Sequence, residues 1–182
     1  MSTDVLGASL LSLARNAIGH RFSLPTRPVT QLPEHRQPAA TFVTLTQHGE
    51  LRGCIGSLEA HRPLAEDVNE NALAAAFRDP RFAPLRAEEF ELTRIEVSLL
   101  TPATPLRFSD EGDALRQLQP DRDGIILQHG RRRATFLPQV WASLPTPELF
   151  LRQLKRKAGL PEDFWDSDLA LFRYHVRKWK EA

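Results

Sequence analysis

The chain has 182 residues, of which 24 are basic and 23 acidic, so its formal net charge at pH 7 is +1. This balance argues against bulk electrostatic attraction to nucleic acid or to an anionic membrane. The single cysteine excludes an internal disulfide, and the length with 41% hydrophobic content predicts one domain over residues 1–182, with one or two lobes. No apolar run approaches the ~20 residues of a membrane span, and we expect a soluble cytoplasmic protein without a signal peptide.

The beginning of the chain predicts a helix followed by an extended segment. Apolar residues at helical spacing predict a helix over residues 4–18, capped by Ser2 or Thr3 and ended by Gly19. Residues 20–38 contain four prolines and little apolar periodicity. They predict an extended segment that crosses the surface and packs against the body of the protein.

A β-hairpin and a helix follow. Residues 41–46 are rich in β-branched and aromatic side chains, and the turn at 48–49 joins them to a second strand at 51–55. Apolar residues along one side predict a helix over 63–77. The proline-bracketed stretch 79–84 ends this helix, because residues before proline avoid helical backbone angles.

The rest of the chain continues the mixture of helices and strands, which predicts an α+β protein. In chain order we predict a short helix at 87–90, a half-buried strand at 93–100, a short helix from 110 to 118, hairpin strands at 125–127 and 133–136, helices at 138–143 and 148–158, a last strand at 169–176, and a solvated tail at 177–181.

A tripeptide repeats at the two predicted hairpin turns. Gln47-His48-Gly49 and Gln128-His129-Gly130 are identical, and the same offsets after them carry an arginine and then Cys54 or Thr135. Helical patterns follow each hairpin. The repeat predicts two related halves, each a hairpin with helices. Coincidence is the alternative, since hairpin turns often place glycine after a polar residue.

The stretch from Leu51 to Gly56 is the strongest candidate site. Side chains alternate across a strand, so Arg52, Cys54 and Gly56 share one face. The arginine favours a thiolate, and the two glycines, Gly53 and Gly56, leave bare backbone for a close ligand. We predict a nucleophilic or ligand-contacting cysteine in an electropositive notch. The alternative is a buried thiol used for packing, the common fate of a free cysteine.

Two further residues are candidates near this stretch. His61 follows it in the chain and is a candidate base for the cysteine, although an exposed histidine before a helix usually has no such role. Arg81 lies in the rigid loop Asp79-Pro80-Arg81-Phe82, from which a guanidinium can bind an anion. The alternative for Arg81 is an ion pair with Asp79.

Other site types are not supported by the sequence. The six histidines have no metal-ligand spacing, and no phosphate loop or dinucleotide fingerprint is present, so we predict neither a metal nor a cofactor. Charges at Arg131-Arg132-Arg133 alternate across a strand. They fit a solvated edge strand better than a nucleic-acid patch.

Several motifs together resemble the AMMECR domain family. They are Leu51-Arg52-Gly53-Cys54-Ile55-Gly56-Ser57, Asp79-Pro80-Arg81-Phe82, Ser98-Leu99-Leu100, the segment from Ala134 to Trp141, and Lys157-Ala158-Gly159-Leu160. The resemblance implies an α+β fold with a mainly antiparallel sheet and two pseudo-symmetric hairpin-plus-helix halves. It implies no particular reaction.

The resemblance also implies site residues and partners. The motif positions carry over as Arg52, Gly53, Cys54 and Gly56, with Arg81 and Lys157 as further candidates. Family members of the AmmeMemoRadiSam set are encoded beside a Memo-type protein and a radical SAM enzyme. The resemblance therefore implies these two proteins as partners.

These observations lead to two main hypotheses. The first is a thiol-dependent enzyme that acts on a small molecule or modified substrate, with Cys54 as nucleophile, Arg52 as activator, and Arg81 or Lys157 as the group that binds an anion. The second is a non-catalytic module that binds a small molecule, a peptide or the partner enzymes. Nucleic-acid binding is a weaker third hypothesis.

Overall fold

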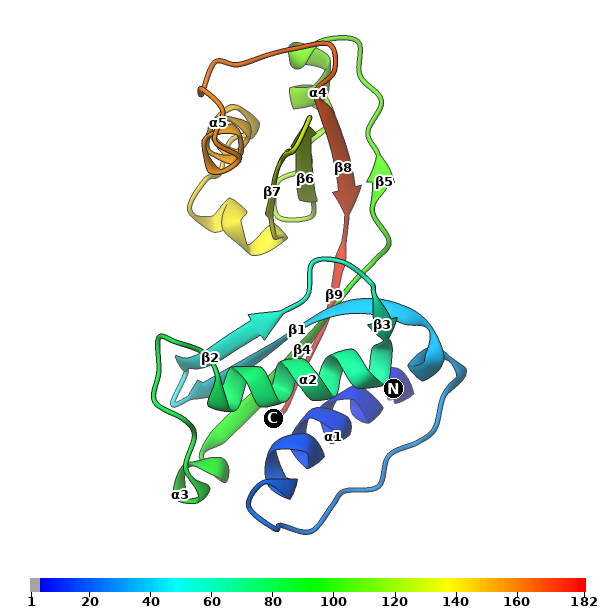
Figure 1. The fold of residues 1–182 in the computed structure, drawn as a ribbon, viewed down its shortest axis with the longest axis vertical. Coiled ribbons are helices and arrows are strands. Elements are labelled where there is room, and N and C mark those ends of the chain that lie inside the picture. Colours follow the sequence, from blue (N-terminus) through cyan, green and yellow to red (C-terminus); the bar gives the residue numbers. More distant parts are fainter. Residues whose placement is uncertain (1–3) are drawn as a thin grey trace. The chain divides into compact units, whose positions relative to one another are not determined.

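A computed structural model describes residues 4–182, so Ser2 and Thr3, predicted as helix caps, lie outside the described residues. The chain divides into two compact units. One contains the chain up to Leu100 together with Arg177–Ala182, and the other contains Thr101–Val176. Each unit combines helices with a β-sheet, which confirms the predicted α+β class (Figure 1). Among the described residues, no helix has the length and apolar character needed to cross a membrane.

The first unit packs helices against one face of a five-stranded sheet, in the order β2-β1-β4-β9 with β3 paired to β1. Its elements are α1 (Val5–His20), a 3-10 turn η1 (Pro33–Arg36), β1 (Pro38–Gln47), β2 (Glu50–Gly56), β3 (Arg62–Pro63), α2 (Leu64–Phe77), α3 (Ala87–Phe90), β4 (Thr93–Leu100) and β9 (Val176–Lys180).

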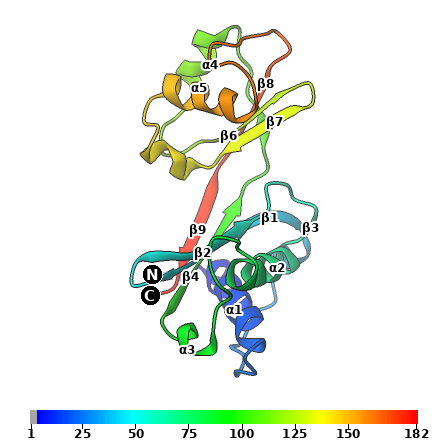
Figure 2. The ribbon, with the colours of Figure 1, turned by 60° about the vertical axis from the view of Figure 1, so that its left-hand side comes forward.

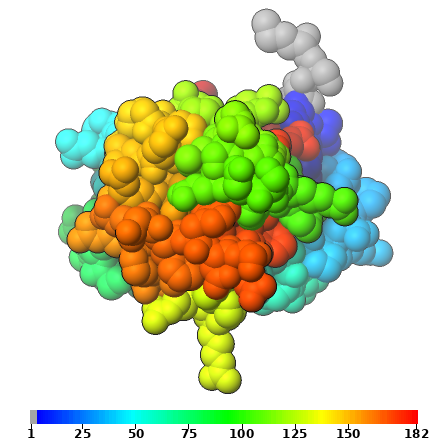
Figure 3. All heavy atoms as spheres, turned by 90° about the horizontal axis from the view of Figure 1, so that it is seen from above, coloured from blue at the N-terminus to red at the C-terminus, as the bar shows by residue number. Residues whose placement is uncertain are grey.

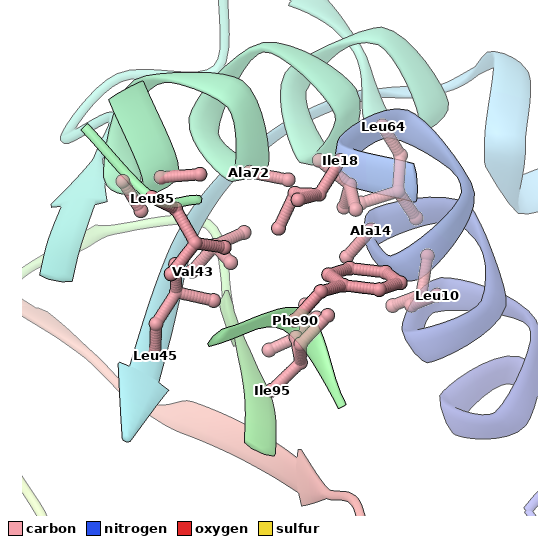
Figure 4. Packing of buried hydrophobic residues seen from close by; sticks show 14 residues of the cluster. Leu10, Ala14, Ile18, Val43, Leu45, Leu64, Ala72, Leu85, Phe90 and Ile95 are labelled. Carbon is pink, nitrogen blue, oxygen red and sulfur yellow. The ribbon is translucent and has the colours of Figure 1, made fainter. Parts of the chain in front are cut away.

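The core of this unit lies between the sheet and helices α1 and α2. Val43 and Leu45 of β1 point towards the helices, beside Ile95 of β4 (Figure 4). All three are fully buried, and each such side chain contributes about 1.5–3 kcal/mol by leaving water. Because strand side chains alternate, Thr44 and its cross-strand neighbour Glu96 lie on the opposite face of the sheet.

The first helix differs from its prediction at both ends. Asp4 is the N-cap, and its side chain accepts a hydrogen bond from the backbone N–H of Gly7. The predicted stop at Gly19 is wrong, since α1 continues to His20. Gly19 instead lies inside the helix, where the ring of Phe90 approaches the space that a Cβ atom would fill.

The predicted solvated tail at 177–181 is also wrong, because these residues complete the first unit. β9 pairs with β4, and the ring of Trp179 lies against Gly7 of α1. Glu181 accepts hydrogen bonds from the guanidinium of Arg15 and from the backbone N–H of Ile95. Three charged residues of this strand region pair with residues far away in the sequence, namely Glu181 with buried Arg15, Lys178 with Glu96 of β4, and Arg177 with exposed Asp4.

The second unit contains a four-stranded antiparallel sheet in the order β5-β8-β6-β7, and the tip of its β6–β7 hairpin projects from the rest of the unit (Figure 2). Its elements are β5 (Thr104–Pro105), α4 (Glu111–Gln117), β6 (Gly124–His129), β7 (Arg132–Phe136), a 3-10 turn η2 (Pro138–Ala142), α5 (Pro147–Lys157) and β8 (Ala170–Tyr174). The single strand predicted at 169–176 is thus β8 followed by the start of β9.

The two hairpins place Cys54 and Thr135 at equivalent positions. Cys54 pairs with Thr44, Thr135 pairs with Ile126, and each pair is the fourth from its turn. The two turns use different residues of the repeated tripeptide, so the strands begin at different distances from it. A bulge at Arg52 adds one residue to β2 and thereby brings Cys54 to the position equivalent to Thr135. The structure therefore supports two related hairpin-plus-helix halves.

We expect Glu181→Ala to lower the free energy of unfolding by about 3 kcal/mol, because it leaves the buried guanidinium of Arg15 without its carboxylate. Urea unfolding of the whole chain measures this loss. The control is Glu50→Ala, at an exposed position, which should change stability by less than about 0.5 kcal/mol. Equal effects of the two substitutions would contradict a structural role for the C-terminal segment.

Candidate functional site

Cys54 lies on the sheet face opposite to the helices, where it begins a row of polar residues. Its half-buried Sγ is 3.2 Å from the hydroxyl oxygen of Thr44 on β1. The next residue across the sheet is Glu96 of β4, whose carboxylate is 3.8 Å from the ammonium of Lys178 on β9. Thiol, hydroxyl, carboxylate and ammonium thus follow one another across four strands.

The backbone of Cys54 is held by the side chains of Asp79 and Arg81. β2 is an edge strand, and the N–H of Cys54 donates to Asp79 Oδ2 at 2.9 Å. The C=O of the same residue accepts from Arg81 Nη2 at 3.2 Å. The two side chains are paired with each other at 2.7 Å. An ion pair from the loop thereby satisfies the edge of β2, where a neighbouring strand would otherwise be needed.

The electrostatics of this pair fix both groups in their charged forms. The side-chain hydrogen bond from Arg81 and the backbone N–H of Cys54 hold the pKa of Asp79 far below its usual range, against the effect of its burial. Asp79 raises the pKa of Arg81, and Cys54 adds to that rise. Arg81 is therefore a cation close to the thiol, with a half-exposed side chain. The ion pair with Asp79 is the alternative that the sequence offered for Arg81, whereas the contacts of both side chains with the backbone of Cys54 were not predicted.

Arg52, predicted as the activator of the thiol, is engaged elsewhere. Its Nε and Nη2 donate to the carboxylate of Glu89 on α3 at 3.1 and 3.2 Å. The remaining nitrogen, Nη1, is buried without a hydrogen-bond partner among residues 4–182. Hydrogen bonds from Arg52 lower the pKa of Glu89 to about 2. The bulge at Arg52 breaks the simple alternation on which the predicted proximity to Cys54 rested.

The two motif glycines are packed against other parts of the chain. A Cβ atom at Gly53 would lie 2.2 Å from the carbonyl oxygen of Ala75 in α2. A Cβ atom at Gly56 would lie 2.2 Å from the ring of Phe42 on β1. Each glycine thus permits a close internal contact, and binding by these residues stays a prediction.

His61 and Lys157 have local partners. The Nδ1 atom of exposed His61 is 2.9 Å from the carbonyl oxygen of Glu59. Among residues 4–182, which include all six histidines, no imidazole hydrogen-bonds to the thiol of Cys54. Lys157 belongs to the second unit, where its ammonium donates to the carbonyl oxygen of Thr135 at 2.9 Å. It makes there the contact that Arg81 makes with the carbonyl of Cys54.

A buried polar cluster beside the motif strand was missed by the sequence prediction. Asp67 of α2 is fully buried and accepts hydrogen bonds from Thr41, Ser57 and Arg62 at 2.7–2.8 Å. Asn71, one turn later, donates to the same carboxylate. Two polar residues four positions apart on the buried side of an amphipathic helix were the available signal. The cluster fixes the segment between β2 and α2.

A hollow of about 510 Å³ lies between α4 and α5 in the second unit. Figure 3 shows the orange end of α5 and the green of α4 adjoining on this unit's surface. Both basic side chains that line the hollow are paired with carboxylates, since Lys155 lies 2.5 Å from Glu111 and Arg152 lies 4.0 Å from Glu162. In the described part of the chain, no group of three or more His, Cys, Asp or Glu side chains is arranged to hold a metal.

Fold and site together define an α+β protein with two hairpin-containing units and a cysteine motif braced at a strand edge. Comparison with protein families gives a match to the AMMECR1 family over residues 11–179. The chain belongs to this family, as the motifs around Cys54 and Arg81 indicated.

Individual relatives agree with this assignment. A protein of Methanothermobacter thermautotrophicus is 38% identical over 96% of this chain and 94% of its own. A protein of Thermotoga maritima is 37% identical over 88% of this chain and 89% of its own. The crystal structure of the uncharacterised protein PH0010 from Pyrococcus horikoshii covers 98% of this chain and 93% of its own, with 33% identity and a TM-score of 0.82.

Glu89→Gln should lower the free energy of unfolding at pH 7 by roughly 2–3 kcal/mol. The folded pKa of Glu89, about 2, is below its ordinary 4.5. Its stabilisation is therefore fully present above about pH 4.5 and is lost as the pH falls towards 2. Urea unfolding at pH 7, 4 and 3 should show the variant and the natural chain converging in stability. Glu88→Gln, at the exposed neighbour, is the control and should leave the pH dependence unchanged.

Gly53→Ala should destabilise the chain by about 1–3 kcal/mol, because its methyl group overlaps backbone that belongs to α2. Thermal unfolding measures the change. In Gly112→Ala the new methyl group meets only ordinary contacts at 3.4 Å, within helix α4. That control should be neutral or slightly stabilising. A neutral Gly53→Ala would show that Gly53 is not required for packing against α2.

Proposed function

We propose that the chain is a non-catalytic binding module whose contact surface is the polar row Cys54, Thr44, Glu96 and Lys178. The observation that carries this proposal is the local environment of the thiol. Cys54 hydrogen-bonds with the hydroxyl of Thr44, and the loop that bears Arg81 braces its backbone. This arrangement presents a fixed set of polar groups without a base next to the nucleophile.

The geometry favours ligand binding because the sheet fixes the backbone positions of the row before a ligand binds. The sheet fixes the spacing between Cys54, Thr44 and Glu96. Asp79 satisfies the edge of β2, so the strand needs no partner to keep its shape. A surface that is ordered in advance loses less conformational entropy on binding.

A thiol-dependent enzyme acting on a small molecule or modified substrate is the second candidate. The guanidinium of Arg81 near Cys54 favours it, since a nearby cation stabilises a thiolate. In this alternative Arg81 replaces Arg52 as the activating cation. Glu96, the cross-strand neighbour of Thr44, is the carboxylate of the row.

The proposed partners are a Memo-type protein and a radical SAM enzyme. Membership of the AMMECR1 family supports them through the resemblance to the AmmeMemoRadiSam set. The row suits a protein surface with an ammonium or guanidinium group, which would share the carboxylate of Glu96 with Lys178.

The proposal predicts that Glu96→Lys weakens binding of a purified Memo-type protein at least tenfold, because it reverses the charge at the centre of the row. Calorimetric titration measures the affinity of each variant for the purified Memo-type protein and the purified radical SAM enzyme, both taken from the same genome. Glu66→Lys makes the same charge change at an exposed position of α2 and should bind as the natural chain does.

Cys54→Ser distinguishes the two candidates. If the chain is a binding module, the affinity of this variant for the partner should stay within about threefold of the natural value. The reason is that serine preserves the hydrogen bond with Thr44. If neither purified protein binds, the partner proposal fails. If a thiol-dependent turnover is found that Cys54→Ser abolishes without loss of fold, the enzyme replaces the binding module.

A further inference from the structure

We infer that the hollow beside η1 is a binding site for a carboxylate group attached to a small apolar substituent. The hollow has a volume of about 420 Å³ and is lined by Gln31, Leu32, Pro33, Arg36 and Gln37. Its size falls within the range of about 300–1,000 Å³ that is typical of small-molecule sites. The site lies entirely within the first unit and involves none of the residues proposed above for partner binding.

The charge of the hollow selects an anion. Arg36 is its only ionisable lining residue among those described, and its exposed guanidinium forms no ion pair within residues 4–182. Glu34 belongs to the same turn but does not line the hollow. A guanidinium presents parallel N–H groups that match the two oxygens of a carboxylate. Its unused donors are therefore the principal recognition element.

The other lining residues define the rest of the ligand. Gln31 and Gln37 also line the hollow, and a glutamine amide has N–H groups that can donate to a carboxylate oxygen. Leu32 and Pro33 supply an apolar wall next to these polar groups. One guanidinium beside an apolar wall suits a carboxylate on a short hydrocarbon group. It suits phosphate less well, because a phosphate site usually contains more than one cation.

The backbone around the hollow is fixed before a ligand binds. His35 is buried, and its Nδ1 accepts a hydrogen bond from the N–H of Leu32 at 3.5 Å. Its Nε2 lies 3.0 Å from the hydroxyl oxygen of Ser9, which donates to the carbonyl of Thr30. The carbonyl of Gln37 accepts from the N–H of Leu64 at 2.9 Å. Binding thus requires little ordering of the backbone around the hollow.

A carboxylate attached to a small apolar group can come from two sources, a free small acid and the C-terminal residue of a peptide. The probes are 4-methylpentanoate, its neutral amide, and the peptide Gly-Gly-Ala-Leu with a free or an amidated C-terminus. Heteronuclear NMR of the isotope-labelled full chain follows the side-chain amides of glutamine during titration. We expect the free acid to shift signals of Gln31 and Gln37 saturably and the amide to shift neither.

Arg36→Gln should weaken binding of the free acid at least about tenfold, since it removes a charge-assisted pair. Arg36 has no ion-pair partner to lose in the described chain, so the variant should fold normally. Arg107→Gln makes the same change at an exposed arginine of the second unit and should bind as the natural chain does. Response to the peptide acid alone would assign the site to a protein C-terminus. Equal response to acid and amide, undiminished binding by Arg36→Gln, or no response to either acid would overturn the inference.

Discussion

The ion pair between Asp79 and Arg81 is the interaction on which the motif strand depends. Every second residue of an antiparallel edge strand directs its N–H and its C=O away from the neighbouring strand, and burial without partners is costly for both groups. At Cys54 the carboxylate accepts from the N–H and the guanidinium donates to the C=O. These hydrogen bonds and the ion pair favour the charged forms of both groups. The lowered pKa of Asp79 and the raised pKa of Arg81 are the consequence.

The second unit uses the same device with different chemistry. Lys157 donates to the carbonyl of Thr135, the position equivalent to Cys54 in the other hairpin. The hydroxyl of Thr135 is directed inward, where it donates to the carbonyl of Ile125 and lies 2.9 Å from the hydroxyl of Tyr174. One scaffold therefore carries a partly exposed thiol in one unit and a buried structural hydroxyl in the other. This asymmetry restricts any cysteine-dependent function to the first unit.

Local patterns in the sequence predicted most elements, while contacts between distant segments limited the prediction of the site. Alternation and turn residues identified the hairpin of Cys54, and proline placement identified the loop of Arg81. The partner of Arg52 was not predictable, because Glu89 lies 37 positions away and a bulge changes the direction of the side chain. The C-terminal strand was missed for a similar reason, since the partners of Arg177, Lys178 and Glu181 lie far away in the sequence.

Strand β1 connects the two surfaces that we propose for binding. It begins directly after Gln37, at the hollow of Arg36, and continues to Thr44 in the row of Cys54. The two surfaces differ in charge, because the row carries the paired charges of Glu96 and Lys178 while the hollow carries the charge of Arg36. Between them, Asp67 binds the backbone and hydroxyl of Thr41, so that the strand which joins these surfaces is fixed to α2 midway along its length.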